Sequence, residues 1–189
     1  MSEGNTLTKY DEARTASLGQ TGGTFYAEDL VTARENQRLR RNADKIIRAE
    51  DQVWEDCPHG RIRHVAHPKL NHHINDIEIY MQELSPDGRS GKHRHMAEEF
   101  MFILEGRGYS LHWDAEMEIR EAFAWDNSST PRRFDWEAGD WVYVPVGTAH
   151  QHFNSDGDGI ARFLSASCRV FKALGWHDLE ELEDAPRER

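Results

Sequence analysis

The stretch GKHRHMAEEFMFILEGRG, residues 91–108, holds two histidines one residue apart, a glutamate four positions after the second, and an apolar run that ends in glycines. The apolar run 100–104 is typical of a buried strand. Residues two apart on a regular strand point to the same face, so we expect His93, His95 and Glu99 to project together. Buried polar groups of this kind need a partner, and the rest of the sequence has to supply it.

A second stretch, GDWVYVPVGTAHQHFN at residues 139–154, raises the expectation of a shared polar interior. Its first apolar residues predict a strand, Pro145 stops strand pairing, and Gly147 permits a tight turn. His150 then enters the next strand, and His152 has the same parity. Further imidazoles are therefore expected to face the interior that holds the first two.

Together the two stretches resemble the paired motifs of the cupin superfamily. The first motif, G-x5-H-x-H-x3-E-x6-G, is matched except that Gly88 lies one residue too close to the first histidine, and the second, G-x5-P-x-G-x2-H-x3-N, is matched at every fixed position. The resemblance implies a double-stranded β-helix in which His93, His95, Glu99 and His150 bind one divalent metal ion. The pair formed by His150 and His152 is similar to the tandem histidines of gentisate-type ring-cleaving cupins.

The remaining sequence predicts an all-β fold with additions at both ends. Between residue 74 and residue 168, short alternating strand patterns are separated by Gly-, Pro-, Asn- and Asp-rich turns, which favours a β-sandwich or barrel. We therefore expect a cupin (jelly-roll) barrel over residues 74–168. Residues 1–73 are interpreted as an arm and a helical extension with one or two helices over 27–54, and residues 169–189 as a C-terminal helix and tail.

Composition narrows the classes of partner. A chain of 189 residues with 38% hydrophobic and 30% charged residues fits one globular domain. Its net charge of -11 argues against nucleic acid and anionic membranes, and leaves a small-molecule substrate as the expected partner. No signal peptide or membrane-spanning run is visible, so a cytoplasmic location is predicted, with Cys57 and Cys168 as isolated thiols. A barrel of this size is expected to form a homodimer.

The predicted ligands also bear on function. Three imidazoles and one carboxylate leave open positions on an octahedral ion, and we favour Fe(II), with Mn(II), Ni(II) or Zn(II) as alternatives. The leading hypothesis, implied by the resemblance, is a dioxygenase that cleaves a carbon–carbon bond in a small aromatic or oxygenated acid. An oxygen-independent lyase, isomerase or decarboxylase and a non-catalytic small-molecule-binding cupin remain as alternatives.

Catalytic groups are expected beside the metal. His152 and Tyr143 are the predicted catalytic residues, with Tyr80 and Tyr109 as further candidates for moving a proton. The histidine-rich segment 59–73 matches no ligand spacing, and no second metal site is predicted there.

Overall fold

The computed structural model describes residues 24–70, 74–119, 123–177 and 179–186, without the side chains of residues 117–125. Its contacts divide the chain into two compact units, residues 1–45 with 71–73, and residues 46–70 with 74–189. The predicted N-terminal arm, His72, His73 and the last three residues of the tail lie outside the described residues.

The first unit contains helix α2, Phe25–Asn42. It is strongly polar, and Glu35 and Arg38 form an ion pair three positions apart on its surface. Ala43 adopts an extended conformation and ends α2, and the short 3-10 helix η1 (Ala49–Asp51) follows within the predicted range to residue 54. None of the described helices is long and apolar enough to cross a membrane.

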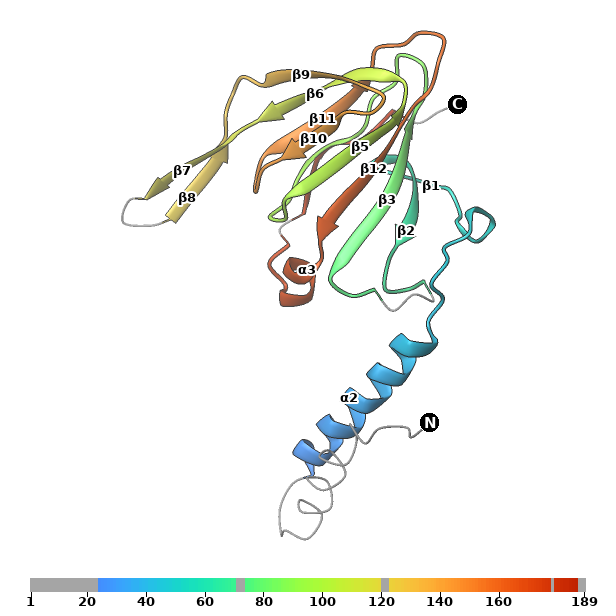
Figure 1. Ribbon diagram of the computed structural model, residues 1–189. Helices are drawn as coiled ribbons and strands as arrows, with labels where there is room; N and C mark the ends of the chain where they lie inside the picture. Colours follow the sequence, from blue (N-terminus) through green and yellow to red (C-terminus); the bar gives the residue numbers. More distant parts are fainter. Residues whose placement is uncertain (1–23, 71–73, 120–122, 178, 187–189) are drawn as a thin grey trace. The chain divides into compact units, whose positions relative to one another are not determined.

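The second unit is built from two large antiparallel sheets (Figure 1). The six-stranded sheet has the order β1-β2-β3-β12-β5-β10. Its strands are β1 (Glu55–Cys57), β2 (Gly60–Ala66), β3 (Ile77–Leu84), β12 (Ala161–Cys168), β5 (Glu99–Glu105) and β10 (Trp141–Val144).

The five-stranded sheet has the order β13-β4-β11-β6-β9. Its strands are β13 (Glu180–Glu183), β4 (Lys92–Arg94), β11 (Ala149–Asn154), β6 (Arg107–Trp113) and β9 (Arg132–Glu137). A separate hairpin of β7 (Ala115–Ile119) and β8 (Phe123–Asn127) continues from β6 and β9 (Figure 1). The short elements η1 (Ala49–Asp51) and α3 (Val170–Leu174) complete the second unit.

The hydrophobic core lies between the two sheets. Strand alternation along β5 buries Met101 and Ile103 and exposes Phe100, as expected for a sheet with one covered face. Trp136 of β9 meets Phe163 of β12 edge to face, with ring centroids 6.5 Å apart, so side chains of both sheets meet. The core cluster consists of Leu84, Met101, Ile103, Trp136, Val142, Ala161 and Phe163.

The predicted fold class is confirmed, with an N-terminal helix and a short C-terminal helix. Two details differ from the sequence-based expectation. β1 and β2 precede residue 74 and belong to the six-stranded sheet, where the sequence analysis placed no strand. The C-terminal helix ends at Leu174, and residues 180–183 form β13 on the edge of the other sheet. The domain boundaries at residues 73 and 168 stay a prediction.

Candidate metal centre

Four buried donor side chains come together in the second unit. β4 supplies His93, the turn after it supplies His95, and β5 begins with Glu99. β11 supplies His150, whose register partner on β4 is His93. One ligand atom from each residue lies within 4.8 Å of those of the others. These four residues, called the tetrad below, are the ones that the sequence analysis named as metal ligands.

Backbone carbonyls orient two of the imidazoles. Nδ1 of His95 lies 2.7 Å from the carbonyl oxygen of Ala97, and Nδ1 of His150 lies 2.9 Å from that of Thr148. A carbonyl only accepts, so Nδ1 carries the proton in both rings. In the neutral rings the lone pair therefore lies on Nε2, the nitrogen that faces Glu99.

The carboxylate of Glu99 is held at both oxygens. Ser165 donates its hydroxyl to Oε1 over 2.6 Å, and the hydroxyl of Tyr80 lies 3.5 Å from the same oxygen. Oε2 faces Nε2 of His95 at 2.9 Å and Nε2 of His150 at 3.7 Å. Glu99 thus presents one oxygen to the tetrad while β12 and β3 fix the other.

Several ring nitrogens in this cluster lack a partner within the described part of the chain. Neither ring nitrogen of His93 forms a hydrogen bond, nor does Nε2 of His150, and the two side chains are 1% and 0% exposed. A buried polar group left without a partner costs about 1–3 kcal/mol. A divalent ion at this position would bind Nε2 of His150 and one ring nitrogen of His93, and mixed nitrogen and oxygen donors suit such ions. The tetrad could therefore hold a metal ion.

The protonation states of His93 and Glu99 also suit a metal ion. Burial lowers the pKa of His93 well below its ordinary value, and repulsion from His59 and His150 lowers it further. Burial alone would raise the pKa of Glu99, but the nearby imidazoles of His150 and His95 hold this pKa well below its usual range. A neutral imidazole and an ionised carboxylate are the forms that bind metals.

His152, predicted to be catalytic, lies inside the sheets behind the tetrad. Its ring centroid is 5.4 Å from that of His150, and its side chain is 1% exposed. Ser110 bonds to Nδ1 of His152 over 2.8 Å and accepts a hydrogen bond from Trp136 Nε1 over 3.0 Å. Nε2 has no partner among the described residues. This placement suits a supporting role beside the tetrad.

Tyr143, the second predicted catalytic residue, is placed elsewhere. It is 44% exposed on β10, where Val142 and Val144 take the buried positions. Its ring packs against Phe100 and its hydroxyl donates to Glu98. The alternation of β10 gives Tyr143 the outward face, which does not fit the predicted catalytic role at the tetrad.

A cavity of about 240 Å³ opens onto the tetrad. His93, His95 and Glu99 line it together with Tyr80 and His59. Nε2 of His59 lies 3.1 Å from the hydroxyl of Tyr80. Burial raises the pKa of Tyr80 well above its ordinary value, and the nearby carboxylate of Glu99 raises it further, so the hydroxyl keeps its proton.

His59 forms a smaller second cluster that spacing in the sequence did not reveal. Its ring centroid lies 3.7 Å from that of His93, and its Nδ1 is 3.2 Å from Oε1 of Glu181. One ligand atom from each of these three residues falls within 4.8 Å of the other two. Because His93 is shared with the tetrad and Glu181 is exposed, we treat His59 as a neighbour of the tetrad.

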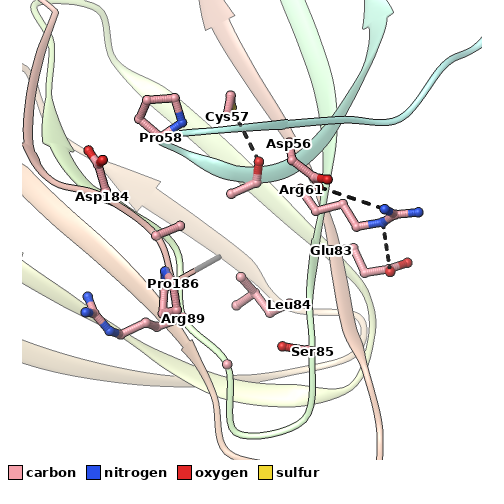
Figure 2. Close-up of a pocket in the computed structure, with 13 residues that line it drawn as sticks. Asp56, Cys57, Pro58, Arg61, Glu83, Leu84, Ser85, Arg89, Asp184 and Pro186 are labelled. Carbon is pink, nitrogen blue, oxygen red and sulfur yellow. Dashed lines mark hydrogen bonds and ion pairs between the residues drawn. The ribbon is translucent and has the colours of Figure 1, made fainter. Parts of the chain in front are cut away.

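A larger cavity of about 640 Å³ lies beside the β1–β2 turn and the C-terminal tail (Figure 2). Its arginines are paired, since Arg61 lies 3.4 Å from Glu83 and Arg89 lies 2.6 Å from Glu183. No tetrad residue lines it. Size alone therefore does not identify the site, and the orphaned histidine nitrogens mark the smaller cavity.

Comparison with known proteins identifies the family. The sequence model of a family described as auxin binding protein matches residues 47–171. The chain belongs to the auxin-binding-protein family. This match covers the tetrad and most of both large sheets, and with the structural neighbours it confirms the cupin fold.

Solved structures similar to the second unit share its fold at low sequence identity. The polyketide cyclase RemF from Streptomyces resistomycificus gives a TM-score of 0.52 at 16% identity, covering 74% of this chain and 85% of RemF. A point mutant of the oxalate decarboxylase OxdC from Bacillus subtilis gives 0.53 at 17% identity, covering 70% of this chain and 30% of OxdC. A further OxdC structure, described by its Mn(II) centres, gives 0.50 at 19% identity, covering 64% and 28%.

Proposed function

We propose that this member of the auxin-binding-protein family is an enzyme that holds one divalent ion in the tetrad and converts a small acid beside it. The observation that carries the proposal is the set of buried, unpartnered nitrogens of His93 and His150 at a cavity large enough for a small molecule. A purely structural cluster would leave these nitrogens uncompensated, whereas a bound ion would satisfy Nε2 of His150 and one ring nitrogen of His93.

The proposed reaction is a dioxygenation that cleaves a carbon–carbon bond in a small aromatic or oxygenated acid. Fe(II) is the proposed metal, with Mn(II), Ni(II) and Zn(II) as alternatives, because the three-histidine, one-carboxylate donor set accepts all four. When bound, the ion supplies the open coordination positions that such chemistry needs. Glu99 and the three histidines hold the ion, and Ser165 keeps the Glu99 carboxylate in place.

Tyr80, one of the tyrosines that the sequence analysis named as candidates for moving a proton, lines the tetrad cavity, and Tyr143 does not. Its hydroxyl remains protonated and lies between Nε2 of His59 and the carboxylate of Glu99. A hydroxyl there can donate a hydrogen bond to an oxygen of the substrate. Ile62 and Leu179 line the same cavity and exclude water from part of it.

Oxygen consumption tests the proposed reaction. Protein loaded anaerobically with Fe(II) is mixed with catechols, hydroxybenzoates, gentisate-like acids and diketones. We expect substrate-dependent oxygen uptake that His95→Ala abolishes and Tyr80→Phe slows, with Tyr143→Phe close to wild type because that side chain faces outward. If none of these substrates causes oxygen uptake, the proposed dioxygenation is rejected.

The pair of His59 and Tyr80 favours a second candidate, an oxygen-independent lyase, isomerase or decarboxylase. The imidazole of His59 can accept or donate the proton that such reactions move, and the Tyr80 hydroxyl 3.1 Å away can orient this ring at the wall of the cavity. The similar structures RemF and OxdC are a cyclase and a decarboxylase by name. Turnover that persists without oxygen would single out this candidate.

A third candidate is a protein that binds a small molecule without converting it, as the family name describes for auxin. Stoichiometric ligand binding without turnover, in air and under nitrogen, would favour it. We also propose that the protein acts in the cytoplasm as a homodimer, with a small molecule as its partner and neither nucleic acid nor membrane.

A further inference from the structure

One wall of the tetrad cavity comes from the C-terminal segment. Lys172 of α3, His177, Leu179 and Glu181 of β13 line the cavity together with the tetrad histidines. This segment is tied to the strand that carries the ligands, because β13 pairs with β4. The amide of Met96 donates to the carbonyl of His177 over 2.9 Å, and the rings of His177 and His95 stack with centroids 5.8 Å apart.

Next to this wall lies a buried carboxylate of β3 that contacts more than one cation. Glu78 of β3 is 6% exposed, and its Oε2 lies 2.5 Å from Nζ of Lys172 and 3.6 Å from Nη1 of Arg169. Nδ1 of His64 lies 3.7 Å from the other oxygen. A single carboxylate needs one cation to compensate its charge, and Arg169 can fill that role. Lys172 can therefore turn toward a ligand without leaving Glu78 unpaired.

The charges around the cavity favour an anion once a divalent ion is bound. Three carboxylates line it, from Glu78, Glu99 and Glu181. Lys172 on the lining and the two charges of the ion balance these three, and Arg169, which contacts Glu78 but does not line the cavity, adds one positive charge without counting any histidine. This local balance is opposite in sign to the net charge of -11 of the whole chain.

We propose that Lys172 determines the specificity of the cavity by binding the carboxylate of the substrate. The inference rests on the proposed function, in which a small acid reacts at the tetrad. Lys172 supplies the ammonium group for the carboxylate, and Ile62 and Leu179 contact the apolar body of the same molecule. The ligand class is a compact carboxylic acid with one negative charge and an apolar or aromatic body that fits about 240 Å³.

Binding of benzoate and benzamide tests the inference without requiring turnover. The two probes have nearly the same shape and differ in charge. Titration calorimetry on Mn(II)-loaded protein is expected to show tighter binding of benzoate than of benzamide in the wild type. In Lys172→Met, benzoate should bind about tenfold to a hundredfold more weakly, the usual range for a charge-assisted hydrogen bond, and benzamide should change little.

Three variants make the result specific. Lys69→Met removes the same charge at an exposed position that does not line the cavity and should keep the preference for benzoate. Lys172→Arg should keep most of the preference for benzoate, because it keeps the positive charge. The double variant Glu78→Gln, Lys172→Met removes the carboxylate together with the lysine that contacts it and should lose the preference even if the single variant is unstable.

Two results would overturn the inference. One is a wild type without a preference for benzoate, including a wild type that binds neither probe. The other is a preference that the folded single or double variant retains, which would place the carboxylate on the metal ion alone. Oxygen uptake is measured separately. If no substrate causes oxygen uptake but the preference for benzoate over benzamide depends on Lys172, the proposed reaction is rejected and this inference is kept.

Discussion

Ser165 on β12 donates a hydrogen bond of 2.6 Å to Oε1 of Glu99, which turns Oε2 toward His95. A hydrogen bond of this kind fixes the direction of a metal-binding carboxylate. We therefore predict that Ser165→Ala weakens metal binding about 10- to 100-fold while the protein stays folded. Competition with a chelator of known affinity measures the effect.

Ser167→Ala is the matched control for this prediction. Ser167 lies on the same strand and lines the same cavity, and in the described structure it makes no hydrogen bond to Glu99. Its variant should bind metal as the wild type does. Equal losses in both variants would mean that the hydroxyl of Ser165 does not position the carboxylate.

His93 is predicted to lower the stability of the metal-free protein. Its unpartnered ring nitrogens are buried, so His93→Leu should raise the free energy of unfolding in the presence of a chelator by about 1–3 kcal/mol. The same variant should lose the stabilisation that metal gives the wild type, about 2.7 kcal/mol at a free metal concentration one hundred times the dissociation constant. Urea unfolding with and without metal measures both effects.

His112→Leu separates these two effects. Nε2 of His112 is also buried without a partner among the described residues, but His112 is not in the tetrad. We expect the metal-free protein to be stabilised and the response to metal to be kept. A metal-free His93→Leu protein that is less stable than the wild type would contradict the account of the orphaned nitrogens.

Gly106 and Gly139 are both motif glycines with positive φ, and only one of them is crowded. A Cβ at Gly106, where φ is 85°, would lie 2.7 Å from the Cα of Ala161, whereas a Cβ at Gly139, where φ is 98°, has no atom within 4 Å. Gly139→Ala should cost about 1–3 kcal/mol of unfolding free energy from backbone strain alone. Gly106→Ala should cost at least about 1 kcal/mol more.

Urea denaturation of the two alanine variants tests this difference. Equal losses of unfolding free energy would show that the close approach of β12 to Gly106 does not limit the residue at that position.

The homodimer remains a prediction from the sequence and is checked by light scattering. One chain has a mass of 21.9 kDa, so we expect a particle of twice this mass at micromolar concentration. A single species with the mass of one chain would reject the dimer.

The four tetrad residues were named from the sequence as a group, but the geometry that brings Glu99 to the histidines was not predicted. Strand parity was expected to align Glu99 with His93 and His95. In the structure β4 belongs to one sheet and β5 to the other, and the chain crosses between the sheets at residues 95–98. The spacing of the motif therefore encodes a crossover, which a single regular strand does not describe.

Other parts of the site depend on contacts between distant segments and had no local signal. His59 lies 34 residues before His93, and Ser165 lies 66 residues after Glu99, the tetrad residues that they contact. The segment 180–183 is rich in Glu and Leu, which favours a helix, yet pairing with β4 makes it a strand. Edge pairing of this kind outweighs local propensity and cannot be inferred from one segment.

Metal content tests the central claim most directly. Wild-type protein and His95→Ala are purified in parallel, incubated with the same divalent ion, freed of excess metal and analysed by elemental mass spectrometry. The account predicts about one ion per chain in the wild type and almost none in the variant. A wild type that retains no metal, or a variant that retains as much as the wild type, would contradict a metal centre at the tetrad.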